Sequence, residues 1–208
     1  GVEPAVASTL VEVAATVISN MDHVHLHEGE TILVHGGAGG IGQFAIQYAK
    51  ARGCRVIVTA GTQEKRDFCR ELGADVAIDY HEDWAEQLKE ATDGKGVDAA
   101  FECTSVNVVL DQLVDCLKLK GTLVVESIWS KKAELDIHAV VMKELTIRGI
   151  IGYAHDHEQT IKLVEEGKVD LKPFITGKIG FDGVVDEGFD TLINRNETAV
   201  KILVSPEL

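Results

Sequence analysis

The chain has 208 residues, 45% of them hydrophobic, and a formal net charge of −14 at pH 7. This length suits one large domain or one domain with an appendage, and the apolar fraction is sufficient for a sizeable core. The acidic balance, without any basic run, argues against nucleic acid as a partner. The apolar runs are far shorter than a membrane span and no signal peptide is visible, so neither membrane insertion nor secretion is expected.

The cysteines and the first residue bear on the cellular setting. Four cysteines occur without paired spacing, namely Cys54, Cys69, Cys103 and Cys116. This pattern is typical of reduced thiols rather than of a disulfide framework, so we expect a cytoplasmic protein. The first residue is Gly1 rather than Met, which we interpret as an N-terminus produced by processing or by design.

Apolar periodicity predicts alternating helices and strands through most of the chain. Residues 5–19 are predicted to form an apolar helix, followed by a polar connector at 20–30. Strands are predicted at 31–34, 55–60, 76–80, 97–103, 122–127 and 144–151, with helices at 41–53, 62–72, 82–92 and 106–119 between the first five. Strands that alternate with helices of this length indicate βαβ units. The predicted fold class is α/β, a doubly wound six-stranded parallel sheet of the Rossmann type with a C-terminal extension.

The rhythm changes after Gly152. A further helix is predicted at 156–167, with Ile161, Leu163 and Val164 buried. Beyond it come a stretch at 173–179, an amphipathic stretch at 187–193 and a final strand at 199–204. These elements do not extend the alternating array, so we expect a tail that returns to pack elsewhere.

A glycine-rich turn follows the strand at 31–34. Gly37, Gly39 and Gly42 fit the spacing G-x-G-x-x-G. We expect Gly37 to permit a tight turn, Gly39 to let a pyrophosphate lie against bare backbone, and Gly42 to let the helix pack closely. The amide groups of the helix start would then face the phosphates. The alternative is an ordinary loop, but the strand before the turn and the helix after it favour a nucleotide site.

The end of the second strand indicates which nucleotide. A free ribose 2′-hydroxyl is usually held there by Asp or Glu, but Ala60 occupies the position. Without a carboxylate a 2′-phosphate can enter, so NADP(H) is predicted, with NAD(H) as the weaker alternative. Glu64 counts against the phosphate, and the cations nearby are alternatively plain surface charges. The residues predicted to surround the 2′-phosphate are Ala60, Gly61, Thr62, Lys65 and Arg66.

Histidines form two small groups. His23, His25 and His27 alternate, which would place three imidazoles on one side of an extended connector and allow a transition metal. No nearby ligand completes such a site, and we favour a solvated connector, so no metal is predicted. His155 and His157 stand at a helix start, where capping and solvation are favoured over acid–base chemistry.

The chain resembles a known superfamily. The runs at 12–16, 29–42 and 58–65 resemble the NADPH-dependent quinone oxidoreductases of the medium-chain dehydrogenase/reductase superfamily. The runs at 101–105, 124–130, 141–145 and 199–202 are similar to its zinc-dependent butanediol and sorbitol dehydrogenase branch. The resemblance implies hydride transfer between NADPH and a quinone, enone or carbonyl compound in a complete enzyme. Alternatives are an NAD-dependent butanediol-type alcohol dehydrogenase and a domain that binds the dinucleotide without turnover.

The resemblance also implies contacts. The pyrophosphate would be held by the turn up to Gly42, chiefly through Ala38, Gly39, Gly40 and Ile41. Thr104 and Ser105 would flank the adenosine side, and Ser127 and Ile128 would lie beside the nicotinamide. Each of these could instead be a plain strand-end residue. No catalytic residue is predicted, and we expect Cys103 to pack as a small apolar side chain rather than act as a nucleophile.

Family architecture suggests how the chain is divided and assembled. We assign 1–28 to a linking helix and connector, 29–152 to the dinucleotide-binding domain, and 153–208 to a C-terminal helix and a return segment toward a GroES-like catalytic domain that we expect to be absent. Glu3 would be a zinc ligand in the polyol branch but a linker residue in the quinone reductases, and we favour the linker. The edge strand at 144–151 would join two copies into a homodimer.

Overall fold

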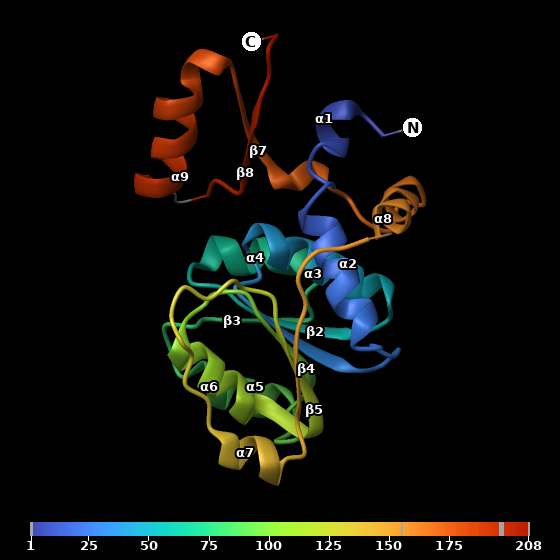
Figure 1. The fold of residues 1–208 in the computed structure, drawn as a ribbon, viewed down its shortest axis with the longest axis vertical. Coiled ribbons are helices and arrows are strands. Elements are labelled where there is room, and N and C mark those ends of the chain that lie inside the picture. The colour runs from blue at the N-terminus through green and yellow to red at the C-terminus, as the bar shows by residue number, and fades with distance from the viewer. Residues whose placement is uncertain (1, 155, 196–197, 208) are drawn as a thin grey trace.

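The computed structural model describes residues 2–154, 156–195 and 198–207. At its centre lies a six-stranded sheet in the order β3-β2-β1-β4-β5-β6, with every neighbouring pair parallel (Figure 1). The strands are β1 (Thr31–His35), β2 (Arg55–Thr59), β3 (Val76–Ile78), β4 (Val97–Glu102), β5 (Leu117–Val125) and β6 (Thr146–Gly149). The strand order reverses between β1 and β4, which confirms the doubly wound fold and places its switch point there.

Helices cover both faces of the sheet (Figure 1). One face carries α2 (Val13–His23), α3 (Gly40–Ala51) and α4 (Gln63–Glu71), and the other carries α5 (Trp84–Ala91), α6 (Asn107–Cys116) and α7 (Ile137–Met142). Successive residues of a strand point to opposite faces, so Val34 joins the core beneath α3 while Leu33 joins the core beneath α5 and α6. The sheet is therefore buried on both sides.

The C-terminal part begins with α8 (Asp156–Glu165) and includes a small second sheet. Its elements are η1 (Lys172–Phe174), β7 (Ile175–Ile179), η2 (Phe181–Gly183), η3 (Val184–Phe189), α9 (Asp190–Asn194) and β8 (Lys201–Val204). Strands β7 and β8 pair in parallel, and they lie beyond the helices of the main sheet (Figure 1). Leu171 and Phe174 are buried in the same core as α3, and the Gln47 side chain makes two hydrogen bonds of 2.8 and 2.7 Å with the Asp170 backbone. These contacts fix the tail to the main body.

The prediction of one long helix at 5–19 is wrong. The segment forms the short α1 (Pro4–Ala7) and then α2, with a turn between them. Ser8 Oγ donates to the Ala5 carbonyl at 2.8 Å and Thr9 Oγ1 donates to the Val6 carbonyl at 2.7 Å. Hydroxyl groups that bond the preceding turn compete with continued helix, which explains the break. The second helix also extends to His23, into the predicted connector.

Three other details differ from the sequence prediction. The helix predicted to 119 ends at Cys116 because Leu117 pairs with Val97 of β4, so β5 begins five residues early. Helix α7 was not predicted, and its first turn is capped by Asp136, whose Oδ1 accepts from the Ala139 amide at 3.2 Å. Ile161 is 46% exposed instead of buried, because α8 lies at the margin of the core.

Within the described ranges, no helix combines the length and the apolar character needed to cross a membrane. All four cysteines are described, and each carries a free thiol.

Candidate functional site: the carboxyl edge of the sheet

The turn after β1 is tightly constrained. Gly36 adopts a left-handed backbone with φ of +82°, whereas Gly37 does not. The expectation that Gly37 permits the turn is therefore wrong in detail: Gly36 makes the turn, and Gly37 is needed because a Cβ there would lie 2.8 Å from Val58 Cβ. At Gly42 a Cβ would lie 2.5 Å from the Gly36 carbonyl oxygen, so the first turn of α3 presses directly on this turn.

Space remains open on the outer side of the turn. A Cβ at Gly39 would meet only the Gly36 carbonyl oxygen, at 3.4 Å. Gly39 is the N-cap of α3, and the amide groups of Gly40 and Ile41 have no backbone acceptor among the described residues. Free amides at a helix start, beside a glycine without a side chain, form a cradle suited to phosphate oxygens. The geometry of Gly37–Gly42 therefore fits a dinucleotide pyrophosphate.

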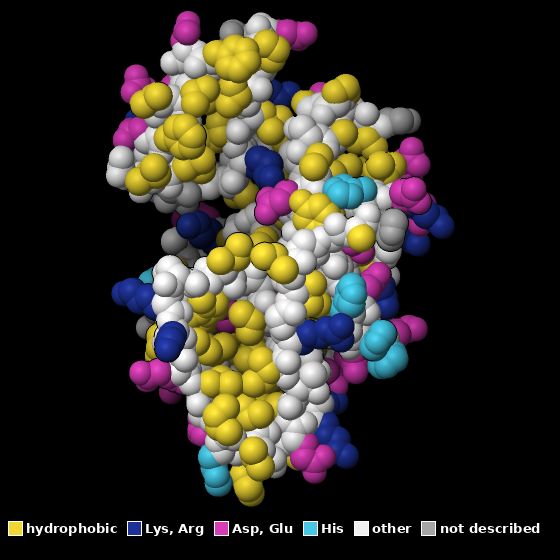
Figure 2. Space-filling model, in the orientation of Figure 1, with side chains coloured by type: hydrophobic (Ala, Val, Ile, Leu, Met, Phe, Trp, Pro, Cys, Tyr) yellow, Lys and Arg dark blue, Asp and Glu magenta, His cyan; other side chains and the backbone are white. Residues whose placement is uncertain are grey.

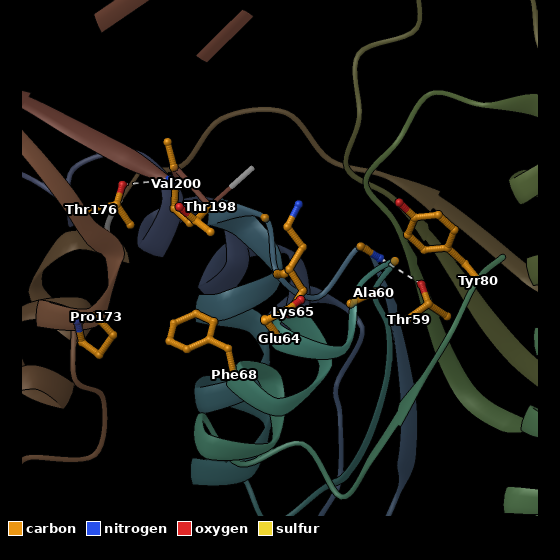
Figure 3. A pocket seen from close by; sticks show the side chains of 15 residues that line it. Thr59, Ala60, Glu64, Lys65, Phe68, Tyr80, Pro173, Thr176, Thr198 and Val200 are labelled. Carbon is orange, nitrogen blue, oxygen red and sulfur yellow. Dashed lines mark hydrogen bonds between the residues drawn. The ribbon is translucent and has the colours of Figure 1, made fainter. Parts of the chain in front are cut away.

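A cleft of about 510 Å³ opens beside this turn (Figure 3). It is bounded by the glycine turn, the end of β2, the start of α4 and the β7–β8 sheet. Ala60 and Tyr80 lie on one side of the cleft, and Thr176 and Val200 lie on the other (Figure 3). Its volume lies within the usual range for ligand pockets, roughly 300–1,000 Å³.

The residues predicted to hold a 2′-phosphate separate into two groups. Ala60, Gly61 and Lys65 line the cleft, and the Lys65 side chain extends into it without an ion-pair partner among the described residues (Figure 3). Arg66 does not line the cleft. Its Nη1 lies 2.6 Å from Asp79 Oδ2 and 3.2 Å from the Ala60 carbonyl oxygen, so its charge is already paired. Binding of a phosphate by Arg66 stays a prediction, and a phosphate would have to compete with Asp79 for this donor.

Thr62 and Glu64 mark the start of α4. The Thr62 hydroxyl caps the helix by accepting from the Lys65 amide at 3.2 Å. Glu64 lines the same cleft as Lys65 (Figure 3). This side of the cleft therefore carries one carboxylate next to a cation that has no ion-pair partner in the described part of the chain.

Three of the predicted residues at the ends of β4 and β5, Thr104, Ser105 and Ser127, gather around one side chain that sequence reasoning missed, Glu102. Its Oε1 accepts from the Thr104 amide at 2.5 Å, the Thr104 hydroxyl at 2.7 Å and the Ser105 amide at 2.8 Å. Its Oε2 accepts from the Ser127 hydroxyl and from Trp129 Nε1. Ser105 Oγ in turn donates to the Ile128 carbonyl at 3.3 Å, while the Ile128 side chain is 82% exposed.

The charge of Glu102 follows from these contacts. Burial alone would raise its pKa, but the hydrogen bonds from Ser127 and Thr104 outweigh burial and hold the pKa below its ordinary value. The group is thus an anion at neutral pH. The only signal in the sequence is an acidic residue that ends a strand directly after the three apolar residues 99–101.

A second acid, Glu126, lies next to it in a different environment. Its Oε1 is buried without a hydrogen-bond partner among the described residues, and its Oε2 accepts from Cys103 Sγ at 3.2 Å. Burial, assisted by the charge of Glu102, raises the pKa of Glu126 to about 7. Burial and Glu126 also raise the pKa of the Cys103 thiol well above its ordinary value, which fits packing rather than nucleophilic chemistry.

A buried histidine supports the glycine turn. His35 Nδ1 and Thr59 Oγ1 are 2.8 Å apart, and the same hydroxyl accepts from the Gly36 amide at 3.2 Å. The His35 ring lies against Tyr80 and Trp84, with centroids 6.0 and 5.4 Å away. Burial lowers the pKa of His35, so the ring is neutral at physiological pH. It links the ends of β1 and β2 without adding charge.

Of the residues that the sequence analysis singled out, His23 and His157 form their hydrogen bonds elsewhere, and Glu3 lines a different cavity. His23 lies in α2 with its Nδ1 2.6 Å from the Ser19 carbonyl oxygen, so His23, His25 and His27 do not form the extended row that was the alternative to a solvated connector. No group of three metal-ligating side chains occurs in the part of the chain that the structure describes. His157 Nε2 lies 2.9 Å from the Val11 carbonyl oxygen, and His155 falls outside the described residues.

Similarity to known proteins extends over nearly the whole chain. Residues 40–166 match the family of zinc-binding dehydrogenases. An (R,R)-butanediol dehydrogenase of Neisseria gonorrhoeae is 53% identical over 182 residues, which cover 86% of this chain and 51% of that protein. A probable quinone oxidoreductase of Schizosaccharomyces pombe is 32% identical over 168 residues, which cover 81% of this chain and 45% of that protein.

Solved structures give the same result. The crystal structure of 2R,3R-butanediol dehydrogenase from Bacillus subtilis matches with a TM-score of 0.86 and 36% identity, over 95% of this chain and 56% of that one. The chain spans about half the length of the curated relatives it matches. It belongs to the zinc-binding dehydrogenase family of the medium-chain dehydrogenase/reductase superfamily and is a cofactor-binding domain of that superfamily, whose cofactor is a nicotinamide dinucleotide.

Proposed function

We propose that this domain binds NADP(H) along the carboxyl edge of the sheet, with the pyrophosphate on the turn Gly37–Gly42. One observation carries the choice of NADP(H). The uncharged Ala60 lines the same cleft as the ammonium group of Lys65, which has no ion-pair partner among the described residues. A phosphate dianion is attracted by a nearby cation, and no acidic side chain stands at the end of β2 to repel it. The adenosine 2′-phosphate would lie between these two residues.

The second candidate is NAD(H), and Glu64 is the observation in its favour. Its carboxylate lines the cleft next to Lys65 and could accept from a ribose 2′-hydroxyl. Fluorescence titration with NADPH and NADH separates the two candidates. We expect tighter binding of NADPH, whereas equal affinities, or a preference for NADH, would contradict the proposed role of Lys65.

In the complete protein we propose hydride transfer between the dinucleotide and the carbonyl group of a hydroxyketone. The product is a diol, the class of compound that the butanediol dehydrogenases are named for. The bound dinucleotide supplies the hydride chemistry, while this domain orients it. Ser127 and Ile128, at the end of β5, would lie beside the nicotinamide. A quinone substrate is the alternative, supported by the relative from Schizosaccharomyces pombe.

Turnover distinguishes an enzyme from a domain that only binds. NADPH oxidation is measured with acetoin and with a benzoquinone, on this chain and on the complete protein. We expect this chain to bind NADPH. We expect the complete protein to oxidise NADPH faster with acetoin than with the quinone. Binding without turnover in both would support the binding-only alternative.

We also propose that two copies join through β6. This strand is the edge of the main sheet and all four of its residues are exposed, including Ile147 at 40%. Ile151, just beyond it, is 87% exposed. An unpaired edge with apolar side chains favours association across a two-fold axis. Light scattering of the wild type and of Ile147→Lys tests this, and a monomeric wild type would contradict it.

The division of the chain is proposed on the same basis. The described residues of 29–152 contain the whole main sheet, and we assign dinucleotide binding to them. The elements after 153 expose a row of apolar side chains, and we assign to them contact with a further domain. The exposed residues are Phe181, Val185, Phe189 and Ile193, and hydrophobic side chains gather over this lobe in Figure 2.

A further inference from the structure

We propose that the buried carboxylate of Glu102 is a positioning group that holds the ends of β4 and β5 in the geometry that receives the dinucleotide. The inference rests on the proposed function and adds to it a residue that acts through the segments it holds. Its ground is the convergence of two chain segments, 104–105 and 127–129, on one side chain.

Every contact of this carboxylate is with a donor. Oε1 takes three donors from Thr104 and Ser105, and Oε2 takes two from Ser127 and Trp129. A carboxylate has two acceptor oxygens and no proton to offer, so it satisfies both sets at once. A glutamine side chain cannot accept from both sets of donors. Its amide NH₂ is itself a donor and would face either the three donors at Oε1 or the two donors at Oε2. The arrangement therefore requires the negative charge and not merely the size of the side chain.

The segment that Glu102 holds is conformationally unfavourable without it. Ser105 has a φ of +59°, in the left-handed region that non-glycine residues rarely adopt. Its amide is bonded to Glu102 Oε1 at 2.8 Å, and its hydroxyl reaches across to the Ile128 carbonyl at 3.3 Å. The carboxylate thus stabilises a turn that links the two strand ends. Without its hydrogen bonds, both segments would be free to move.

The backbone of Glu102 adds a second link to the same segment. Its carbonyl oxygen accepts from the Glu126 amide at 3.0 Å and from the Ser127 amide at 3.3 Å. The main-chain part of the residue thus pairs with the start of the second segment, while its side chain gathers both. A substitution of the side chain should leave this backbone link intact and test the carboxylate alone.

The experiment measures NADPH dissociation constants by fluorescence for the wild type, Glu102→Gln and the double variant Glu102→Gln/Ser105→Gly, with unfolding followed separately by circular dichroism. We expect Glu102→Gln to weaken NADPH binding at least about tenfold, since hydrogen bonds to a charged acceptor are lost. Glycine adopts a left-handed backbone without penalty, so the double variant should recover at least about threefold of that loss. A purely structural role for Glu102 would not produce this recovery.

Glu126→Gln is the matched control, because Glu126 is a neighbouring buried acid that none of the donors from 104–105 or 127–129 contacts. It should bind NADPH as the wild type does. If Glu102→Gln does not fold, Trp129→Phe removes one donor to the carboxylate at a residue that is not assigned to the cofactor, and it should weaken NADPH binding about threefold. Wild-type affinity in a folded Glu102→Gln, or in Trp129→Phe where Glu102→Gln does not fold, would overturn the inference. A wild type that binds neither NADPH nor NADH would instead overturn the proposed function.

Discussion

The two halves of the carboxyl edge are built in different ways. Around Gly36–Gly42 the backbone itself forms the surface, and side chains are excluded because a Cβ at Gly42 would lie only 2.5 Å from the nearest backbone oxygen. Around Glu102 a single carboxylate gathers five donors from two segments. One half depends on the absence of side chains and the other on the presence of one charge. The two halves should therefore fail differently when they are mutated.

The largest expected effect comes from the glycine half. Gly39→Val should abolish NADPH binding while preserving the fold, because the added atoms enter the open space that the phosphates would take. Its matched control is Gly42→Val, whose side chain would meet the Gly36 carbonyl and destabilise the fold by about 3 kcal/mol. Thermal unfolding and titration of both variants separate the two outcomes. Unchanged affinity in Gly39→Val would remove the turn from the site.

The next effect concerns Lys65 and Arg66, the two cations in the first turn of α4. Lys65→Ala should weaken NADPH binding about tenfold and leave NADH binding nearly unchanged, because only NADPH carries the 2′-phosphate. Arg66→Ala is the control, since its guanidinium is paired with Asp79. It should lower stability by about 1 kcal/mol with little change in the ratio of the two affinities. An equal loss of NADPH affinity in both variants would show that Arg66 leaves Asp79 to bind phosphate.

A smaller effect is expected from the pH dependence of stability. The folded state keeps a proton on Glu126 up to a pKa of about 7, whereas the unfolded chain ionises near the ordinary value of 4.5. The folded state therefore binds more protons between these values, and wild-type stability should fall as pH rises from 4.5 to 7. Glu126→Gln removes this fall and should gain about 3 kcal/mol relative to the wild type at about pH 8. Denaturant titrations at about pH 5 and pH 8 measure it, and a gain independent of pH would contradict the assignment.

Glu102 should behave in the opposite sense. Its pKa is lowered in the folded state, so its contribution to stability is present above the ordinary pKa and is lost as pH falls through the lowered one. The two acids, at the neighbouring ends of β4 and β5, therefore contribute opposite pH slopes to the stability. Comparing the pH profiles of Glu102→Gln and Glu126→Gln would resolve them.

The sequence predicts the glycine half of the site much better than the carboxylate half. Strand, glycine turn and helix are local in the chain, and their spacing alone identifies the turn at 36–42. Even there, the partner of Arg66 could not be foreseen, because Asp79 lies on a different element and is brought near only by the pairing of β2 with β3. Local pattern establishes which groups exist and tertiary pairing decides which of them are free.

The role of Glu102 is not local at all. Its donors come from two segments more than twenty residues apart, and they meet because β4 and β5 are neighbours in the sheet. The parallel order predicts that strand ends 103 and 126 lie close together, but not that one acid would accept from both. The predicted end of the helix at 119 is wrong for a related reason, because Leu117 pairs with β4 instead of continuing α6. Sheet pairing overrode the local helical pattern.

The central claim is that an uncharged residue at the end of β2 admits the 2′-phosphate. Its most direct test is the ratio of NADH to NADPH dissociation constants in the wild type and in Ala60→Asp, titrated under the same salt. The account predicts a ratio above one in the wild type, and a fall of at least about tenfold in the variant, because the new carboxylate repels the phosphate and can accept from a 2′-hydroxyl. An unchanged ratio in Ala60→Asp would contradict it.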